Sequence, residues 1–212
     1  MSWPHILSFS RVVAGPIVAA LVLHGPGDPY LLAAVLFGGA SVTDMVDGKL
    51  ARYEQRSNTL GVFLDTTSDK VLVSLALVAM AIGGLTWAWV PLVIVGREFI
   101  ISGLRSYAAS CNLVISAHVW GKGKAALTMA AIVAVLLAAD GRTGGVLAGV
   151  GSHVAWNTIF LGTTWLLAVA AGLTVISGAR YLVDAWPLFR PGPRLAQVQD
   201  EEPPRVAAGG KR

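Results

Sequence analysis

Six long apolar stretches run through this chain, and they constrain its fold more than any other feature. A bilayer core of about 30 Å needs roughly 20 mostly apolar residues per helix. Glycine and proline break the sequence between several of the stretches, as at residues 25–27 and 83–84. We therefore expect an all-α integral membrane protein with six transmembrane helices. They are predicted at residues 7–23, 30–46, 62–82, 87–107, 124–139 and 155–182.

The composition favours the same class. Hydrophobic residues make up 55% of the 212 residues and charged residues 13%, against about 25% charged in a soluble domain. The lone Cys111 excludes an internal disulfide framework. Residues 1–4 carry no basic side chain, so we expect the first stretch to be a retained helix and not a cleaved signal. We expect one transmembrane domain over residues 1–186 and a disordered cytoplasmic tail over 187–212, where Pro, Arg and Glu are frequent.

The distribution of lysine and arginine predicts the orientation. Of the 16 such residues, 13 lie on one side, in the loops, in the tail or near the helix ends of that side; Lys70 and Arg97 lie within the spans, and Arg142 falls in a loop on the opposite side. By the positive-inside rule, both termini and the loops at 49–61 and 108–124 face the cytoplasm. We expect a multi-pass protein of the cell (inner) membrane with both ends inside.

Four aspartates stand at the cytoplasmic edge of the second and third predicted helices. Asp44 and Asp47 share one helix face, and Asp65 and Asp69 are one turn apart on the next helix. An ionisable residue in a membrane span is costly and marks a functional site. Two antiparallel helices joined by a short basic loop would bring all four carboxylates to one point.

The residues around these aspartates point to a metal and a phosphorylated ligand. Four negative charges at one point repel each other unless a cation binds there. Oxygen ligands without His or Cys favour magnesium, manganese or calcium. Gly48 and Ala51 lie on the carboxylate face and leave room for a bulky ligand, and Arg52 offers a fork suited to phosphate oxygens. Together they suggest a substrate bridged by metal, as in phosphoryl transfer.

The spacing of these residues resembles the signature of the CDP-alcohol phosphatidyltransferase family. The eight matching positions are Asp44, Asp47, Gly48, Ala51, Arg52, Gly61, Asp65 and Asp69. Further similarity, at residues 7–11, 97–105 and 121–124, points to the members that use glycerol 3-phosphate as acceptor.

The resemblance implies an activity and a role for each matching residue. Such a protein is a homodimeric six-helix membrane enzyme with a polar cavity open to the cytoplasm. It would transfer the phosphatidyl group from CDP-diacylglycerol to glycerol 3-phosphate and release CMP. Asp69 would be the general base. Two magnesium or manganese ions would be held by Asp44, Asp47, Asp65 and Asp69. The donor nucleotide would contact Ser8, Gly48, Arg52 and Asn58.

The acceptor and the remaining charges are less constrained. The acceptor phosphate would be bound by Arg105, Lys122 and Lys124, at the cytoplasmic ends of the fourth and fifth helices. The alternative is that these are ordinary basic residues of the cytoplasmic side, as the positive-inside rule predicts. Inositol phosphate, serine or a second phosphatidylglycerol are alternative acceptors. Membrane lipids are expected partners and nucleic acid is not.

Two further readings concern the charged residues inside the predicted helices. Adjacent residues on a helix point apart, so Arg97 and Glu98 are not expected to pair with each other. A pair between helices is expected instead, such as Lys70 with Glu98 or Arg97 with an aspartate, and contact with the substrate is the alternative. A carboxylate-lined cation transporter is the alternative of another class, but it predicts charges near the midplane and an internal repeat, and the sequence shows neither.

Overall fold

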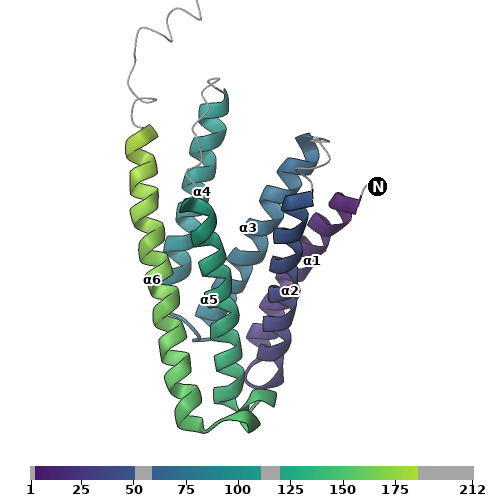
Figure 1. The fold of residues 1–212 in the computed structure, drawn as a ribbon, viewed down its shortest axis with the longest axis vertical. Helices are drawn as coiled ribbons and strands as arrows, with labels where there is room; N and C mark the ends of the chain where they lie inside the picture. Colours follow the sequence, from purple (N-terminus) through teal and green to yellow (C-terminus); the bar gives the residue numbers. More distant parts are fainter. Residues whose placement is uncertain (1–2, 51–58, 111–119, 186–212) are drawn as a thin grey trace, which may run out of the picture.

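The computed structural model describes residues 3–50, 59–110 and 120–185, and these segments consist of helices joined by short turns (Figure 1). Each α-helix matches one predicted stretch and extends beyond it at one or both ends, although α4 begins two residues later than predicted. The prediction of an all-helical chain is confirmed for the described residues. The elements are α1 (Trp3–His24), α2 (Asp28–Leu50), α3 (Thr59–Ile82), α4 (Trp89–Ser110), α5 (Trp120–Thr143), the 3-10 helix η1 (Val146–Val150) and α6 (His153–Ala185).

The helices carry the apolar surface of a membrane protein. By length and composition, Ala125–Thr143 and His153–Val183 are the stretches of the described chain that are long and apolar enough to cross a bilayer. Large apolar side chains are exposed on α1, α2, α3, α4 and α6, among them Leu92 at 73% and Val154 at 76%. Exposed apolar surface on this scale suits a lipid environment better than water.

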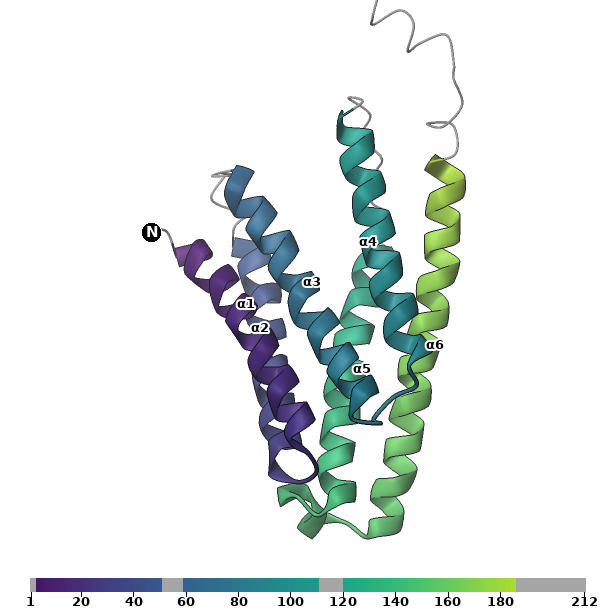
Figure 2. The same ribbon diagram turned by 180° about the vertical axis from the view of Figure 1, so that it is seen from behind.

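Helix α5 is central to the bundle. It packs against α2, α3 and α6, while α1 packs against both α2 and α3, and α4 packs against α3 and α6. Seen from both sides, α1, α2 and α3 lean away from α4 and α6 toward the end at which the N-terminus lies (Figures 1 and 2). The bundle is therefore closed at one end and spread at the other.

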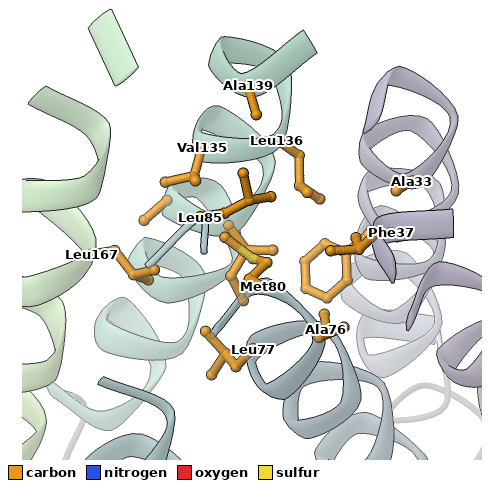
Figure 3. Packing of buried hydrophobic residues seen from close by; sticks show 14 of the residues in the cluster. Ala33, Phe37, Ala76, Leu77, Met80, Leu85, Val135, Leu136, Ala139 and Leu167 are labelled. Carbon is orange, nitrogen blue, oxygen red and sulfur yellow. The ribbon is translucent and has the colours of Figure 1, made fainter. Parts of the chain in front are cut away.

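The main core lies toward the closed end. Phe37 of α2, Met80 of α3, Leu136 of α5 and Leu167 of α6 are all fully buried and meet there (Figure 3). Many of their buried neighbours are alanines, such as Ala76. Small residues let helix backbones approach closely, and this is the usual way in which helices associate inside a membrane.

Glycines end two of the helices at the closed end. Gly84, after α3, has φ +70°, and the N–H of Leu85 donates to the carbonyl oxygen of Met80 at 2.8 Å. Gly144, after α5, has φ +86°, and the N–H of Gly145 donates to the carbonyl oxygen of Asp140 at 3.0 Å. Both are Schellman caps, which need a left-handed residue that glycine supplies without strain.

Hydrogen bonds from α5 fasten the closed end further. Helix α5 was predicted to end at residue 139. It continues to Thr143 and so includes Asp140. Asp140 is fully buried, and its Oδ2 accepts a hydrogen bond from the N–H of Leu147 in η1 at 2.9 Å. The Oγ1 of Thr143 accepts one from the N–H of Gly27, between α1 and α2, at 3.0 Å. The closed end is thus held by polar contacts as well as by the core.

Substitution of Gly141 is expected to destabilise this end. A Cβ at Gly141 would lie 2.3 Å from Cδ2 of the Trp156 ring, too close for any real contact. We expect Gly141→Ala to cost about 1–3 kcal/mol, because the ring or the helix must move, and to lower the Tm measured in detergent. Gly162→Ala is the matched control, since a Cβ there meets nothing within 4 Å. Equal Tm values for the two variants would contradict the packing described here.

Candidate active site

The spread end of the bundle carries the candidate residues. Helix α2 ends at Leu50 and α3 begins at Thr59, so the two run in opposite directions and share this end (Figures 1 and 2). The N-termini of α1 and α5 and the C-termini of α4 and α6 lie at the same end. Because α1 packs against both α2 and α3, the three helices form one wall of this region.

The backbone places the four aspartates on that wall. Asp44 and Asp47 belong to the last two turns of α2, and Asp65 and Asp69 to the first three turns of α3. The helix segments that carry them therefore lie at one end of the molecule. The side chains of all four lie outside the described residues, and their convergence on one point remains a prediction.

Of the other residues predicted to contact the substrates, those at the helix ends whose backbone alone is described also lie at the spread end. Ser8 is in the second turn of α1, Gly48 is near the end of α2, and Lys122 and Lys124 are in the first two turns of α5. Their side chains are not among those described. Arg52 and Asn58, and the predicted tail at 187–212, lie outside the described residues altogether.

Helical register distinguishes two sides of α3. At 100° per residue, Asp65 and Asp69 fall on the same stripe as Leu72 and Ala76, which are buried in the main core. Residues Thr67, Lys70 and Ser74 fall on the opposite side. The aspartate stripe is thus continuous with the core-facing stripe of the helix, and the lysine that follows Asp69 belongs to another surface.

Among the three residues predicted to bind the acceptor phosphate, Arg105 is the one whose side chain the structure describes. It is exposed near the end of α4, and its guanidinium carbon lies 6.0 Å from the centre of the Tyr181 ring of α6. Tyr181 is buried together with Ile101 and Leu104. A guanidinium at this distance over an aromatic face is weakly attracted to it, so Tyr181 helps to hold Arg105 at the spread end.

The expected pairing of the embedded charges is wrong in two respects. Arg97 and Glu98 do contact each other, Nη1 to Oε1, although they are adjacent in α4; the long arginine side chain reaches back across the short distance that helical geometry leaves between neighbours. Lys70 contacts the hydroxyl of Ser102 in α4 and not Glu98. Ser102 in turn donates to the carbonyl oxygen of Glu98 at 2.7 Å.

A pocket of about 490 Å³ opens between α3 and α4. Lys70, Ser102 and Arg105 all contribute to its lining. This pocket was not predicted, because it depends on how two helices are placed side by side. Asp140 was also missed, although an aspartate followed by the glycines at 141, 144 and 145 is a recognisable helix-end pattern.

The residues present suit a divalent cation at the aspartate-bearing helix ends. Four carboxylates from two neighbouring segments form an all-oxygen donor set, which magnesium and manganese prefer. Among the residues whose side chains are described, no three His, Cys, Asp or Glu come together. The side chains of the four aspartates are not among those residues, and their role as metal ligands stays a prediction.

Comparison with known proteins decides the family. The family model for CDP-alcohol phosphatidyltransferase matches residues 1–176, which is most of the chain and includes every predicted site residue. The chain belongs to the CDP-alcohol phosphatidyltransferase family. It is accordingly an enzyme of that class, in which dependence on divalent metal is general.

Three relatives of this phosphatidyltransferase share one name. A protein of Pseudomonas fluorescens is 33% identical over 192 residues, covering 88% of this chain and 91% of the relative. One of Bacillus subtilis is 42% identical over 147 residues (63% and 76%), and one of Yersinia enterocolitica is 35% identical over 189 residues (86% and 94%). Each is named CDP-diacylglycerol–glycerol-3-phosphate 3-phosphatidyltransferase.

Proposed function

We propose that this phosphatidyltransferase uses CDP-diacylglycerol as donor and glycerol 3-phosphate as acceptor, and that it forms phosphatidylglycerol phosphate and CMP. The observation that carries the proposal is the similarity to relatives of that name over 88% of the chain. The basic residues at the spread end are consistent with it, because both substrates are anionic.

The reaction exchanges one phosphorus–oxygen bond for another. A hydroxyl oxygen of the acceptor attacks the β-phosphorus, which carries the diacylglycerol. The bond from that phosphorus to the bridging oxygen breaks, and CMP leaves with the electron pair. Asp69 accepts the proton of the attacking hydroxyl, as a general base within reach of the acceptor. A divalent cation, when bound, offsets the negative charge that builds on the pyrophosphate oxygens.

The remaining residues bind and orient the substrates. Asp44, Asp47 and Asp65, with Asp69, would hold two magnesium or manganese ions. Gly48 leaves room for the nucleotide beside them, and Ser8, Arg52 and Asn58 contact it. Arg105, Lys122 and Lys124 attract the phosphate of the acceptor. Because the donor has two acyl chains and a polar head, a site at the membrane edge lets its tails stay in lipid.

We further propose six membrane spans with both termini in the cytoplasm, in the inner membrane and as a homodimer. The six described α-helices and the bias of Lys and Arg toward the spread end support this topology. It places the active site on the cytoplasmic side, where soluble glycerol 3-phosphate would reach it.

A CMP-release assay with a panel of acceptors tests the activity. Purified protein in detergent should release CMP only when CDP-diacylglycerol, glycerol 3-phosphate and magnesium or manganese are all present. Release with inositol phosphate or serine in place of glycerol 3-phosphate would assign another acceptor. Transport of a cation by vesicles containing the protein, without any CMP release, would overturn the proposal.

Substitution of the acceptor-binding cations is expected to act on KM. Arg105→Ala and Lys122→Ala each remove one charge near the acceptor phosphate, and a charged hydrogen bond of about 1.5–3 kcal/mol corresponds to a rise of about tenfold or more in the KM for glycerol 3-phosphate. The KM for the donor should change little. Arg142→Gln, which removes a charge at the closed end, is the control. Wild-type kinetics in both variants would show that Arg105 and Lys122 do not bind the acceptor and serve only to orient the protein in the membrane.

A further inference from the structure

The connection between α5 and α6 exposes apolar side chains at the closed end of the bundle. Residues 144–151 are glycine, valine, leucine and alanine alone. Val146 and Val150 of η1 are exposed at 62% and 80%, and Val154, in the first turn of α6, at 76%. At the same end, the helix that follows the α1–α2 turn begins with the exposed Asp28. An apolar patch on a connection of this kind marks an interaction surface.

Hydrogen bonds hold this connection in one conformation. Asp140 of α5 is fully buried, and its Oδ2 accepts from the N–H of Leu147 at 2.9 Å. Its backbone carbonyl oxygen accepts from the N–H of Gly145, whose own carbonyl oxygen accepts from the N–H of Ala148, both at 3.0 Å. The other carboxylate oxygen packs so closely on Gly145 that a Cβ there would lie 2.1 Å from it. A buried carboxylate is costly, and this one fixes η1 to the end of α5.

The length of α5 determines how deep the connection lies. The apolar stretch Ala125–Thr143 has 19 residues, about 28 Å at 1.5 Å per residue. A bilayer core is about 30 Å thick, so with Lys124 at one edge of the core the other end of α5 reaches the opposite edge and not beyond it. Trp156 of α6 packs against Gly141 near this end, and tryptophan is enriched at the membrane interface. Residues 144–151 therefore begin at the edge of the hydrocarbon region.

We propose that the α5–α6 connection, with Val154, is a lipid-contact surface that lies at the boundary between acyl chains and headgroups in the leaflet at the closed end. The patch continues along α6 into the exposed Ile159 and Leu161, which belong to the apolar surface of a span. Irregular backbone is costly in contact with lipid unless its polar groups are paired, and the bonded N–H groups of Gly145 and Leu147 meet that condition. The inference rests on the membrane topology proposed above and not on the transferase reaction.

Spin labelling of the full chain in vesicles of phosphatidylcholine and phosphatidylglycerol tests the proposal. Cys111→Ser removes the single cysteine, and Val150→Cys then carries the label. Its collision rate with oxygen, which concentrates in lipid, is compared with that of a water-soluble nickel chelate. The ratio at Val150 should lie near that of Val169→Cys, an exposed position within the α6 span. It should differ clearly from that of Asp28→Cys, which should contact the chelate freely.

The Val169 label separates failure of this inference from failure of the topology. A chelate-accessible label at Val150 together with a lipid-like label at Val169 would overturn the inference alone. Labels that the chelate reaches at both positions would overturn the topology and the inference with it. A label at Val150 that neither oxygen nor the chelate reaches would show that protein, such as a second copy of the chain, covers the connection, and this too would overturn the lipid assignment.

A second pair of variants tests the role of Asp140 in this surface. In the chain labelled at Val150, Asp140→Ala should raise the mobility of the label and its collision rate with the chelate, because the N–H of Leu147 loses its acceptor. Asp140→Asn keeps an oxygen for that hydrogen bond and should resemble the parent chain. The label at Val169 should be unaffected by either change, which shows that the bundle is intact. Equal spectra at Val150 in all three chains would show that Asp140 does not hold η1 in place.

Discussion

Asp69→Asn is expected to reduce kcat for CMP release by about 10³-fold, within the range that a positioned general base contributes. The amide has nearly the shape of the carboxylate but does not accept the proton of the attacking hydroxyl. If Asp69 acts as the base, the KM values for donor and acceptor should stay within a few-fold of wild type when metal is saturating. The loss then belongs to the chemical step and not to binding.

The control for this variant is the same change at the other end of the bundle. Asp28 is exposed in the first turn of α2, at the closed end, and Asp28→Asn should keep wild-type kcat. Thermal unfolding of both variants excludes a loss of fold. A kcat for Asp69→Asn within tenfold of wild type would remove this residue from the proton transfer, while leaving the family assignment intact.

Most of the fold follows from local features of the sequence. Stretches of about 20 apolar residues have no stable alternative to the helix in a membrane, because every backbone group must find its partner within the segment. The glycines at 83–84 predicted a break, and Gly84 indeed ends α3 with a positive φ, as Gly144 ends α5. Local sequence thus gives the helices and their ends to within a few residues.

Contacts between helices were harder to predict. The Lys70–Ser102 contact joins residues 32 apart and depends on the relative height of α3 and α4, which apolar patterns do not determine. The rule that neighbours on a helix point apart failed for Arg97 and Glu98, because it treats side chains as short and rigid. Asp140 escaped notice because the apolar pattern stops at residue 139, whereas the carboxylate serves the backbone of η1 beyond the helix.

The candidate site was predictable in another way. Aspartates at the end of one helix and the start of the next must lie at the same end of an antiparallel pair, and the backbone of α2 and α3 places them so. The spacing also carried the family resemblance, which the match over residues 1–176 confirms. How the side chains converge depends on the packing of three helices, and this is what the sequence alone leaves undetermined.

Asp65→Asn is expected to raise the metal concentration needed for half-maximal activity by about 100-fold. Loss of a second-shell partner already costs about 10–100-fold in affinity, and a lost carboxylate ligand should cost at least as much. Activity should return in part as the magnesium concentration is raised. This distinguishes the variant from Asp69→Asn, in which extra metal should not restore kcat.

A measurement without substrate also tests the assignment. Manganese that binds only the folded state raises Tm as its concentration increases. The same increase in Tm should need a higher manganese concentration in Asp65→Asn but not in Asp28→Asn. Identical metal dependence in wild type and Asp65→Asn would show that the α3 end of the cluster does not hold the cation.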